Sequence, residues 1–227
     1  MDDRVAQLKH LSLADRVRQL GNPIGPLGIA IGDYMNAMNG AINAASFRQL
    51  SPRPGDRVLE IGFGNGKLLS DLMCLAPDIT YDGIDISELM VTEATAFNQA
   101  LVTAGLATFH HASSIAIPFA DKMFDRAIAV NTICFWSEPI YDLTEIRRVL
   151  KSRGVLVLAA MSPAGAAHLI ASGELFRTYD EAQLRSLLIQ AGFSRVEFEP
   201  YREKASQPDG RTIERVFYLV RAVVKTS

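Results

Sequence analysis

The segment VLEIGFGNGKLL, residues 58–69, decides the fold that we predict for this chain. An apolar strand runs directly into Gly62, Gly64 and Gly66, and a helical pattern follows. Glycine has no Cβ, so it permits positive φ and lets a ligand lie against the backbone at a helix N-terminus. A tight turn without a ligand is the alternative explanation of the same glycines. The segment predicts a strand–turn–helix unit able to bind a nucleotide-like ligand.

The spacing of these glycines argues against two common phosphate-binding motifs. A dinucleotide fold requires G-x-G-x-x-G, which would place the third glycine where Lys67 stands. A P-loop requires a glycine and a hydroxyl residue at the positions that Ile61 and Leu68 occupy. A nicotinamide-dependent dehydrogenase is therefore disfavoured.

A second apolar segment, TYDGID at 80–85, ends on Asp85. In a parallel sheet this carboxylate would lie beside the glycine turn, where an acidic side chain can accept hydrogen bonds from both ribose hydroxyls. The same side chain could instead cap the helix that starts at Ser87. The combination with the glycine turn favours ribose binding.

The rest of the chain alternates short apolar runs with helical stretches, a pattern typical of a mainly parallel sheet covered on both faces. Helices are expected to start near Lys67, Ser87, Pro139 and Asp180. The predicted strands are 57–62, 80–85, 108–112, 126–131 and 154–160, followed by a hairpin of 194–200 and 214–224 around a polar turn. One strand near the C-terminus must therefore run antiparallel to the others.

The N-terminal fifty residues lack the alternation of short apolar runs and helical stretches that is seen from residue 51 onward. Residues 1–20 have a helix-like spacing, and Gly21 to Gly32 hold four glycines and two prolines, which predict a loop or hinge. Asp33 is expected to cap a helix that ends before Ser51. We therefore predict two parts: residues 1–50 form a helical cap or lid that is not independent, and residues 51–227 form the ligand-binding domain.

The composition of the 227 residues restricts the class of protein. Hydrophobic residues make up 48% of the chain, enough to form a core. The formal net charge of -2 argues against binding to the phosphate backbone of a nucleic acid. Cys74 and Cys134 lie in apolar segments, so buried thiols are expected rather than a disulfide. No window has the length and apolarity of a membrane span, and the N-terminus lacks signal-peptide features. These observations predict a cytoplasmic protein without membrane or nucleic-acid partners.

Several segments together resemble the class I S-adenosylmethionine-dependent methyltransferases, in their type 11-like small-molecule branch, over roughly residues 51–227. Glu60 to Gly66 resembles the first motif, an acidic residue followed by G-x-G-x-G, and Asp85 matches the ribose-binding acid. The segments 115–131 and 145–158 resemble "LPF.D..FD.V" and "E..RVLKPGG.L.L", and residues 191–193, followed by a strand, resemble the region after the fifth helix. The resemblance implies a Rossmann-like, seven-stranded, mainly parallel sheet with an antiparallel last strand.

The resemblance also implies the cofactor, S-adenosylmethionine, and the residues that bind it. Ile86 matches the residue that lies on the adenine, and the region of Asn131 holds the methionine part. Ser113, followed by Ser114, stands where the family often has an aspartate for the adenine amino group. The implied cofactor-binding set is Glu60, Gly62, Phe63, Gly64, Asn65, Gly66, Asp85, Ile86, Ser113, Ser114 and Asn131.

The predicted activity is transfer of a methyl group to a small-molecule acceptor by in-line displacement. Such a transfer needs alignment more than a strong catalytic residue, so no catalytic residue is assigned, and His168 is only a candidate base. Tyr34, Asn39 and Trp136 are candidate substrate contacts. No cluster has metal-ligand spacing. A protein that binds S-adenosylmethionine without catalysis is the alternative function.

Overall fold

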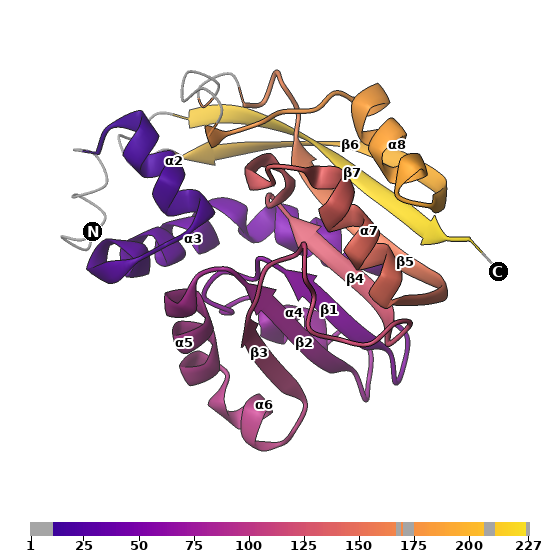
Figure 1. Ribbon diagram of the computed structural model, residues 1–227. Coiled ribbons are helices and arrows are strands. Elements are labelled where there is room, and N and C mark those ends of the chain that lie inside the picture. Colours follow the sequence, from indigo (N-terminus) through magenta and orange to yellow (C-terminus); the bar gives the residue numbers. More distant parts are fainter. Residues whose placement is uncertain (1–10, 167–168, 170–174, 207–211, 226–227) are drawn as a thin grey trace.

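The computed structural model describes residues 11–166, 169, 175–206 and 212–225 (Figure 1). Its framework is one seven-stranded sheet with the order β3-β2-β1-β4-β5-β7-β6. The strands are β1 (Arg57–Ile61), β2 (Thr80–Asp85), β3 (Ala107–His111), β4 (Phe124–Val130), β5 (Leu150–Met161), β6 (Phe193–Ser206) and β7 (Thr212–Val224). Neighbouring strands from β3 to β5 are parallel, and β7 is antiparallel to both β5 and β6. The predicted Rossmann-like topology is confirmed.

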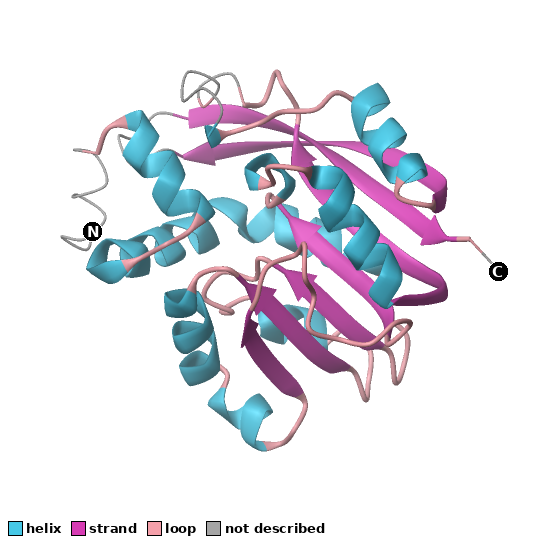
Figure 2. Cartoon of the chain, in the orientation of Figure 1, coloured by secondary structure: helices cyan, strands magenta, loops and turns pink. Residues whose placement is uncertain are grey.

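Helices cover both faces of this sheet (Figure 2). They are α2 (Leu13–Gly21), α3 (Gly25–Leu50), α4 (Leu69–Met73), α5 (Glu88–Phe97), α6 (Gln99–Thr103), α7 (Pro139–Val149) and α8 (Glu181–Gln190), with the short 3-10 helix η2 (Ile133–Phe135). Ser87 caps α5 and Asp180 caps α8, each accepting a backbone N–H through its side chain, as expected at helix starts.

Each central strand contributes alternate side chains to two separate cores. On β1, Leu59 packs with α7 and α8 on one face, whereas Val58 packs with α3 and α4 on the other. On β4, Ala129 packs in the same core as Leu59, and Ile128 packs in the same core as Val58. Burial on both faces explains why these strands are continuous apolar runs in the sequence.

The prediction of a loop over Gly21 to Gly32 was wrong for most of that segment. Helix α3 starts at Gly25 with a proline in its first turn, so Asp33 lies inside the helix and is not its cap. The glycines permit close packing: a Cβ on Gly28 would lie 2.6 Å from Leu89 Cδ2, and one on Gly32 would lie 3.2 Å from Asn65 Nδ2. The last turns of α3 contribute to the core under the sheet, so α3 is integral to the domain.

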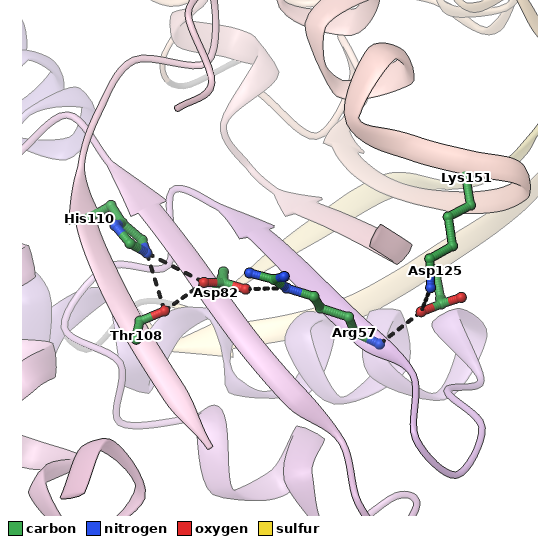
Figure 3. A network of polar contacts seen from close by, with 6 residues as sticks. All are labelled: Arg57, Asp82, Thr108, His110, Asp125 and Lys151. Carbon is green, nitrogen blue, oxygen red and sulfur yellow. Dashed lines mark hydrogen bonds and ion pairs between the residues drawn. The ribbon is translucent and has the colours of Figure 1, made fainter. Parts of the chain in front are cut away.

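A polar network crosses five adjacent strands and comprises Arg57, Asp82, Thr108, His110, Asp125 and Lys151 (Figure 3). The carboxylate of Asp82 accepts hydrogen bonds from Arg57 Nε at 2.8 Å and Thr108 Oγ1 at 2.6 Å, and His110 Nε2 lies 3.4 Å from it. Burial acts to raise the pKa of Asp82, but the contacts with His110, Arg57 and Thr108 outweigh burial and lower it to about 2.

We expect Asp82→Asn to lower the free energy of unfolding by about 2 kcal/mol at neutral pH. Because the pKa is depressed in the folded state, this contribution is complete above about pH 4 and is lost as the pH falls towards 2. Urea unfolding of both proteins between neutral pH and about pH 3 measures the difference. Asp71→Asn, on the exposed side of α4, is the control with no expected change. A difference that does not vary with pH would contradict this explanation.

Candidate active site

One large pocket lies at the carboxyl ends of β1, β2 and β4, beneath α2 and residues 32–43 of α3. Figure 1 shows these two helices on the side towards which the central strands point. The volume of the pocket is about 680 Å³, within the usual range for small-molecule sites. Ends of parallel strands at the point where the strand order reverses are the usual ligand position in open α/β sheets. Here the order reverses between β1 and β4.

The glycine turn forms the floor of the pocket, and its glycines have different roles. Gly62, Gly64 and Gly66 have φ of 71°, 64° and 69°, which side chains rarely adopt. A Cβ on Gly62 would lie 2.2 Å from Thr132 Cγ2, and one on Gly66 would lie 2.7 Å from Ala94 Cβ. A Cβ on Gly64 would meet only Met35 Cε, at 4.0 Å. Gly62 and Gly66 are therefore required by packing, whereas Gly64 presents bare backbone to the open pocket.

Glu60 lies at the end of β1, buried beneath the turn. Tyr81 on β2 donates its hydroxyl to Glu60 Oε2 at 2.8 Å, a contact that the sequence analysis missed. Burial raises the pKa of Glu60 to about 7, and the hydrogen bond from Tyr81 limits the rise. The glutamate thus holds the turn to β2 and supplies a titratable group to the pocket wall.

Asp85 ends β2 and is buried beside the turn. Its carboxylate accepts hydrogen bonds from the Gly64 N–H at 3.2 Å and the Ser87 N–H at 2.9 Å. Burial raises its pKa to about 6, and these backbone hydrogen bonds oppose the rise. The side chain that caps α5 is that of Ser87, not Asp85. A carboxylate placed in this way fits the two hydroxyls of a ribose.

The residues that follow β2 and β3 form the wall next to Asp85. Ile86 is 53% exposed although it is apolar, and it lines the pocket. Ser113 and Ser114 also line it, and Ser114 donates to the buried carboxyl of Asp142 on α7. An exposed apolar side chain opposite polar groups fits the face and the edge of a nucleobase. Phe63, also in the lining, packs its ring 5.0 Å from that of Phe109.

Asn65 connects the glycine turn to α3. Its Oδ1 accepts from Asn36 Nδ2 at 2.7 Å, and its Nδ2 donates to Asp33 Oδ1 at 3.3 Å. Lys67 Nζ pairs with the same aspartate oxygen at 2.5 Å. Asn65 was predicted to lie in the site, but its partners Asp33 and Asn36 were not, because the helix was expected to start at Asp33.

Asn131 follows β4 and has φ of 58°, a conformation that asparagine tolerates better than most residues. Its Nδ2 lies 3.3 Å from Asn39 Oδ1, which also accepts from Arg215 Nη1 at 3.0 Å. Arg215 pairs in turn with Glu203, and their side chains are 4% and 9% exposed. These contacts join β4, α3 and the C-terminal hairpin of β6 and β7. The sequence analysis missed Arg215 and Glu203, because charged residues in a hairpin usually face solvent.

The lining away from the glycine turn and Asp85 mixes apolar and polar side chains. Its apolar members are Leu20, Met35, Met38, Phe135, Met161, Leu175 and Phe176, and the predicted contacts Tyr34 and Asn39 line it together with Arg16, Arg18 and Arg215. The rings of Phe135 and Phe176 lie 5.5 Å apart, edge to face. Trp136 borders the pocket but is only 8% exposed and packs in the core with α7. Phe135 lines the same pocket and is less buried than Trp136, and the substrate contact of Trp136 stays a prediction.

The remaining site prediction, His168, lies outside the described residues. Among the residues that the structure does describe, no group of three or more histidine, cysteine or acidic side chains is arranged to hold a metal ion. In the same part of the chain, no helix combines the length and apolarity of a membrane span.

The fold and the site together define a class: nucleoside-binding α/β proteins with an acidic residue at the end of the second strand. A family profile described as "Methyltransferase domain" matches residues 59–158. An O-methyltransferase of Aspergillus nomiae is 31% identical over 162 residues, which cover 68% of this chain and 72% of that protein. The chain spans 41% to 72% of the length of five curated relatives that it matches.

Solved structures share the fold at lower identity. A SAM-dependent methyltransferase of Methanosarcina mazei has a TM-score of 0.61 at 19% identity, covering 79% of this chain and 97% of the other. A cyclase, SpnF, has a TM-score of 0.64 at 18% identity, covering 82% and 81%. This chain belongs to the class I S-adenosylmethionine-dependent methyltransferases.

Proposed function

We propose that this enzyme transfers a methyl group from S-adenosylmethionine to an oxygen of a small, largely apolar acceptor. The observation that carries the proposal is one pocket whose lining combines residues that fit an adenosine with a group of apolar side chains, among them Met35, Phe135 and Phe176. Several relatives at about 30% identity are named O-methyltransferases, which supports oxygen as the attacked atom.

The proposed roles of the cofactor-binding residues follow from the site. Asp85 accepts the ribose hydroxyls, Ile86 contacts the adenine face, and the glycine turn allows close approach of the nucleoside. The amides of Asn131 and Asn39 face the amino-acid end. The cofactor supplies an electrophilic methyl group on a sulfonium, so the protein mainly aligns the acceptor and excludes water.

The apolar side chains of the lining also limit the acceptor. The methionine, leucine and phenylalanine side chains favour an apolar or aromatic body. None of the described lining residues is a histidine. An acceptor with an acidic hydroxyl, a phenol or an enol, needs little help to lose its proton. We therefore propose this class, with His168 kept as the candidate base.

Transfer of labelled methyl from S-adenosylmethionine tests this function. The panel contains apolar phenols and enols, with amines, thiols and carboxylic acids as the contrast. We expect label on oxygen of the phenols or enols and one S-adenosylhomocysteine per methyl transferred. Tight cofactor binding without transfer to any acceptor would support the non-catalytic alternative, and label confined to amines would overturn the proposed acceptor class.

We also propose that α2 and the part of α3 as far as Asn39 act as the lid, a narrower segment than residues 1–50. Deleting residues 1–21 should leave a folded core that binds cofactor more weakly and transfers no methyl, because water enters and the acceptor is misaligned. Hydrogen exchange of amides from Tyr34 to Asn39 should slow when S-adenosylhomocysteine binds, whereas amides of α8 should not change. Full activity after the deletion would show that α2 is only a structural cap.

A further inference from the structure

A second pocket lies at the opposite edge of the sheet, where β1, β4, β5 and β6 begin and β7 ends. We call it the basic pocket because its lining carries more basic than acidic side chains. The basic residues are Arg53, Arg126, Lys151, Arg153, Arg195 and Arg221, and the acidic ones are Asp56 and Asp125. The volume of the basic pocket is about 640 Å³. A chain whose formal net charge is -2 thus concentrates positive charge in one hollow.

Both acidic side chains of the basic pocket already accept hydrogen bonds from the protein. Asp125 Oδ2 accepts from Lys151 Nζ at 2.7 Å (Figure 3). Asp56 Oδ2 accepts from Arg126 Nε and from the Arg53 N–H, each at 2.8 Å. Each acid therefore neutralises one cation of the lining, and an excess of positive charge remains.

Arg126 is the one buried residue among the six basic ones, with a side chain that is only 8% exposed. Its hydrogen bond to Asp56 through Nε fixes the orientation of the guanidinium group. Neither Nη atom has a hydrogen-bond partner among the described residues, and neither is closed off from solvent by the protein. The two Nη groups therefore reach the surface of the basic pocket with their donors unused. Such a planar fork matches the oxygens of a phosphate group.

Three exposed arginines surround this group, each from a different part of the chain: Arg53 before β1, Arg153 in β5 and Arg195 in β6. Arg153 and Arg195 lie where the pairing of their strands shifts register, and their φ values are 63° and 48°. Bulges of this kind redirect a side chain. None of the three guanidinium groups has a partner among the residues that the structure describes. Like charges that converge in this way repel one another, so a bound anion would be stabilised.

The rest of the lining indicates the kind of anion. It consists of Ser152, Gly154, Val155, Ser194, Val223 and Val224. No aromatic ring is present in the described lining, so a nucleobase would find no surface on which to stack. The hollow has room for more than one phosphate group. A compact ligand with several negative charges fits these features better than a nucleoside does.

We propose that the basic pocket binds a compact ligand with two or more phosphate groups, held by Arg126 inside the pocket and by Arg153 and Arg195 at its rim. Soluble metabolites and phosphorylated lipid headgroups both carry such groups, and the test separates the two sources. The basic pocket lies at the edge of the sheet opposite the candidate active site. The inference therefore does not rest on the proposed function.

Calorimetry with inorganic pyrophosphate at low ionic strength tests the proposal. We expect saturable binding at one site, which weakens as sodium chloride is added because salt screens the charges. The double variant Arg153→Ala/Arg195→Ala should bind at least about tenfold more weakly, because two charged donors are lost. Arg185→Ala/Arg202→Ala is the matched control: it removes the same charge from two exposed positions outside the basic pocket and should bind as the wild type does.

Sedimentation with phosphatidylcholine vesicles, with and without a phosphatidylinositol bisphosphate, identifies the source of the phosphate groups. Pyrophosphate binding without cosedimentation assigns the site to a soluble ligand, whereas cosedimentation that the double variant loses assigns it to a lipid headgroup. If the wild type binds neither probe, or if the double variant and its control bind alike, the proposal is overturned. Both variants replace exposed side chains, and neither measurement requires S-adenosylmethionine or methyl transfer.

Discussion

Replacing Gly64 with valine is expected to lower the affinity for S-adenosylhomocysteine by at least about a hundredfold, while the circular dichroism spectrum changes little. A Cβ at this position meets no atom of the folded chain closer than Met35 Cε at 4.0 Å. A branched side chain would therefore occupy the volume proposed for the cofactor rather than disturb the core. Calorimetry measures the affinity.

A second substitution controls for the backbone strain that Gly64→Val introduces. Gly64 has φ of 64°, and a valine there costs roughly 1–3 kcal/mol of stability whatever surrounds it. Gly105 has φ of 70°, and a Cβ there would meet nothing within 4 Å in the turn before β3. Gly105→Val should therefore carry similar strain and leave cofactor binding unchanged. Retained binding in Gly64→Val would exclude the glycine turn from the cofactor site.

Asp85→Ala is expected to weaken binding of S-adenosylhomocysteine by about 2–4 kcal/mol, or roughly thirtyfold to a thousandfold, because two hydrogen bonds from the ribose to a carboxylate are lost. Asp71→Ala, on exposed α4, is the control. Unchanged affinity by calorimetry would remove Asp85 from the site.

The affinity of the wild type should also depend on pH through Asp85. Burial raises the pKa of this carboxyl to about 6, and the ribose hydroxyls require the ionised form to accept both hydrogen bonds. Binding should therefore be strongest above about pH 7 and weaken as the pH falls through 6. A similar decline in Asp85→Ala would assign the pH dependence to another group, such as Glu60.

The parts of the fold that the sequence predicted have local causes. Strands such as Arg57–Ile61 are buried on both faces, so their apolar runs mark them without knowledge of their neighbours. The glycine turn and Asp85 are adjacent because parallel strands end at the same edge of the sheet. Because one follows the first strand and the other ends the second, the sequence alone predicted that both lie in one pocket.

The features that were missed depend on tertiary contacts. The glycines of α3 were interpreted as helix breakers. Gly28 and Gly32 are instead positions where other elements pack so closely against the helix that little room is left for a side chain. Asp142 and Arg215 occupy positions in α7 and β7 where a charge usually faces solvent. Only the folded chain places Ser114 and Asn39 next to them.

A crystal structure with S-adenosylhomocysteine bound tests most directly the central claim that one pocket holds cofactor and acceptor side by side. The expected density places the ribose on Asp85, the adenine over Ile86, and the sulfur facing the apolar side chains around Phe135 and Phe176. A nucleoside bound away from Asp85, or a sulfur turned away from those side chains, would contradict the proposed arrangement for methyl transfer.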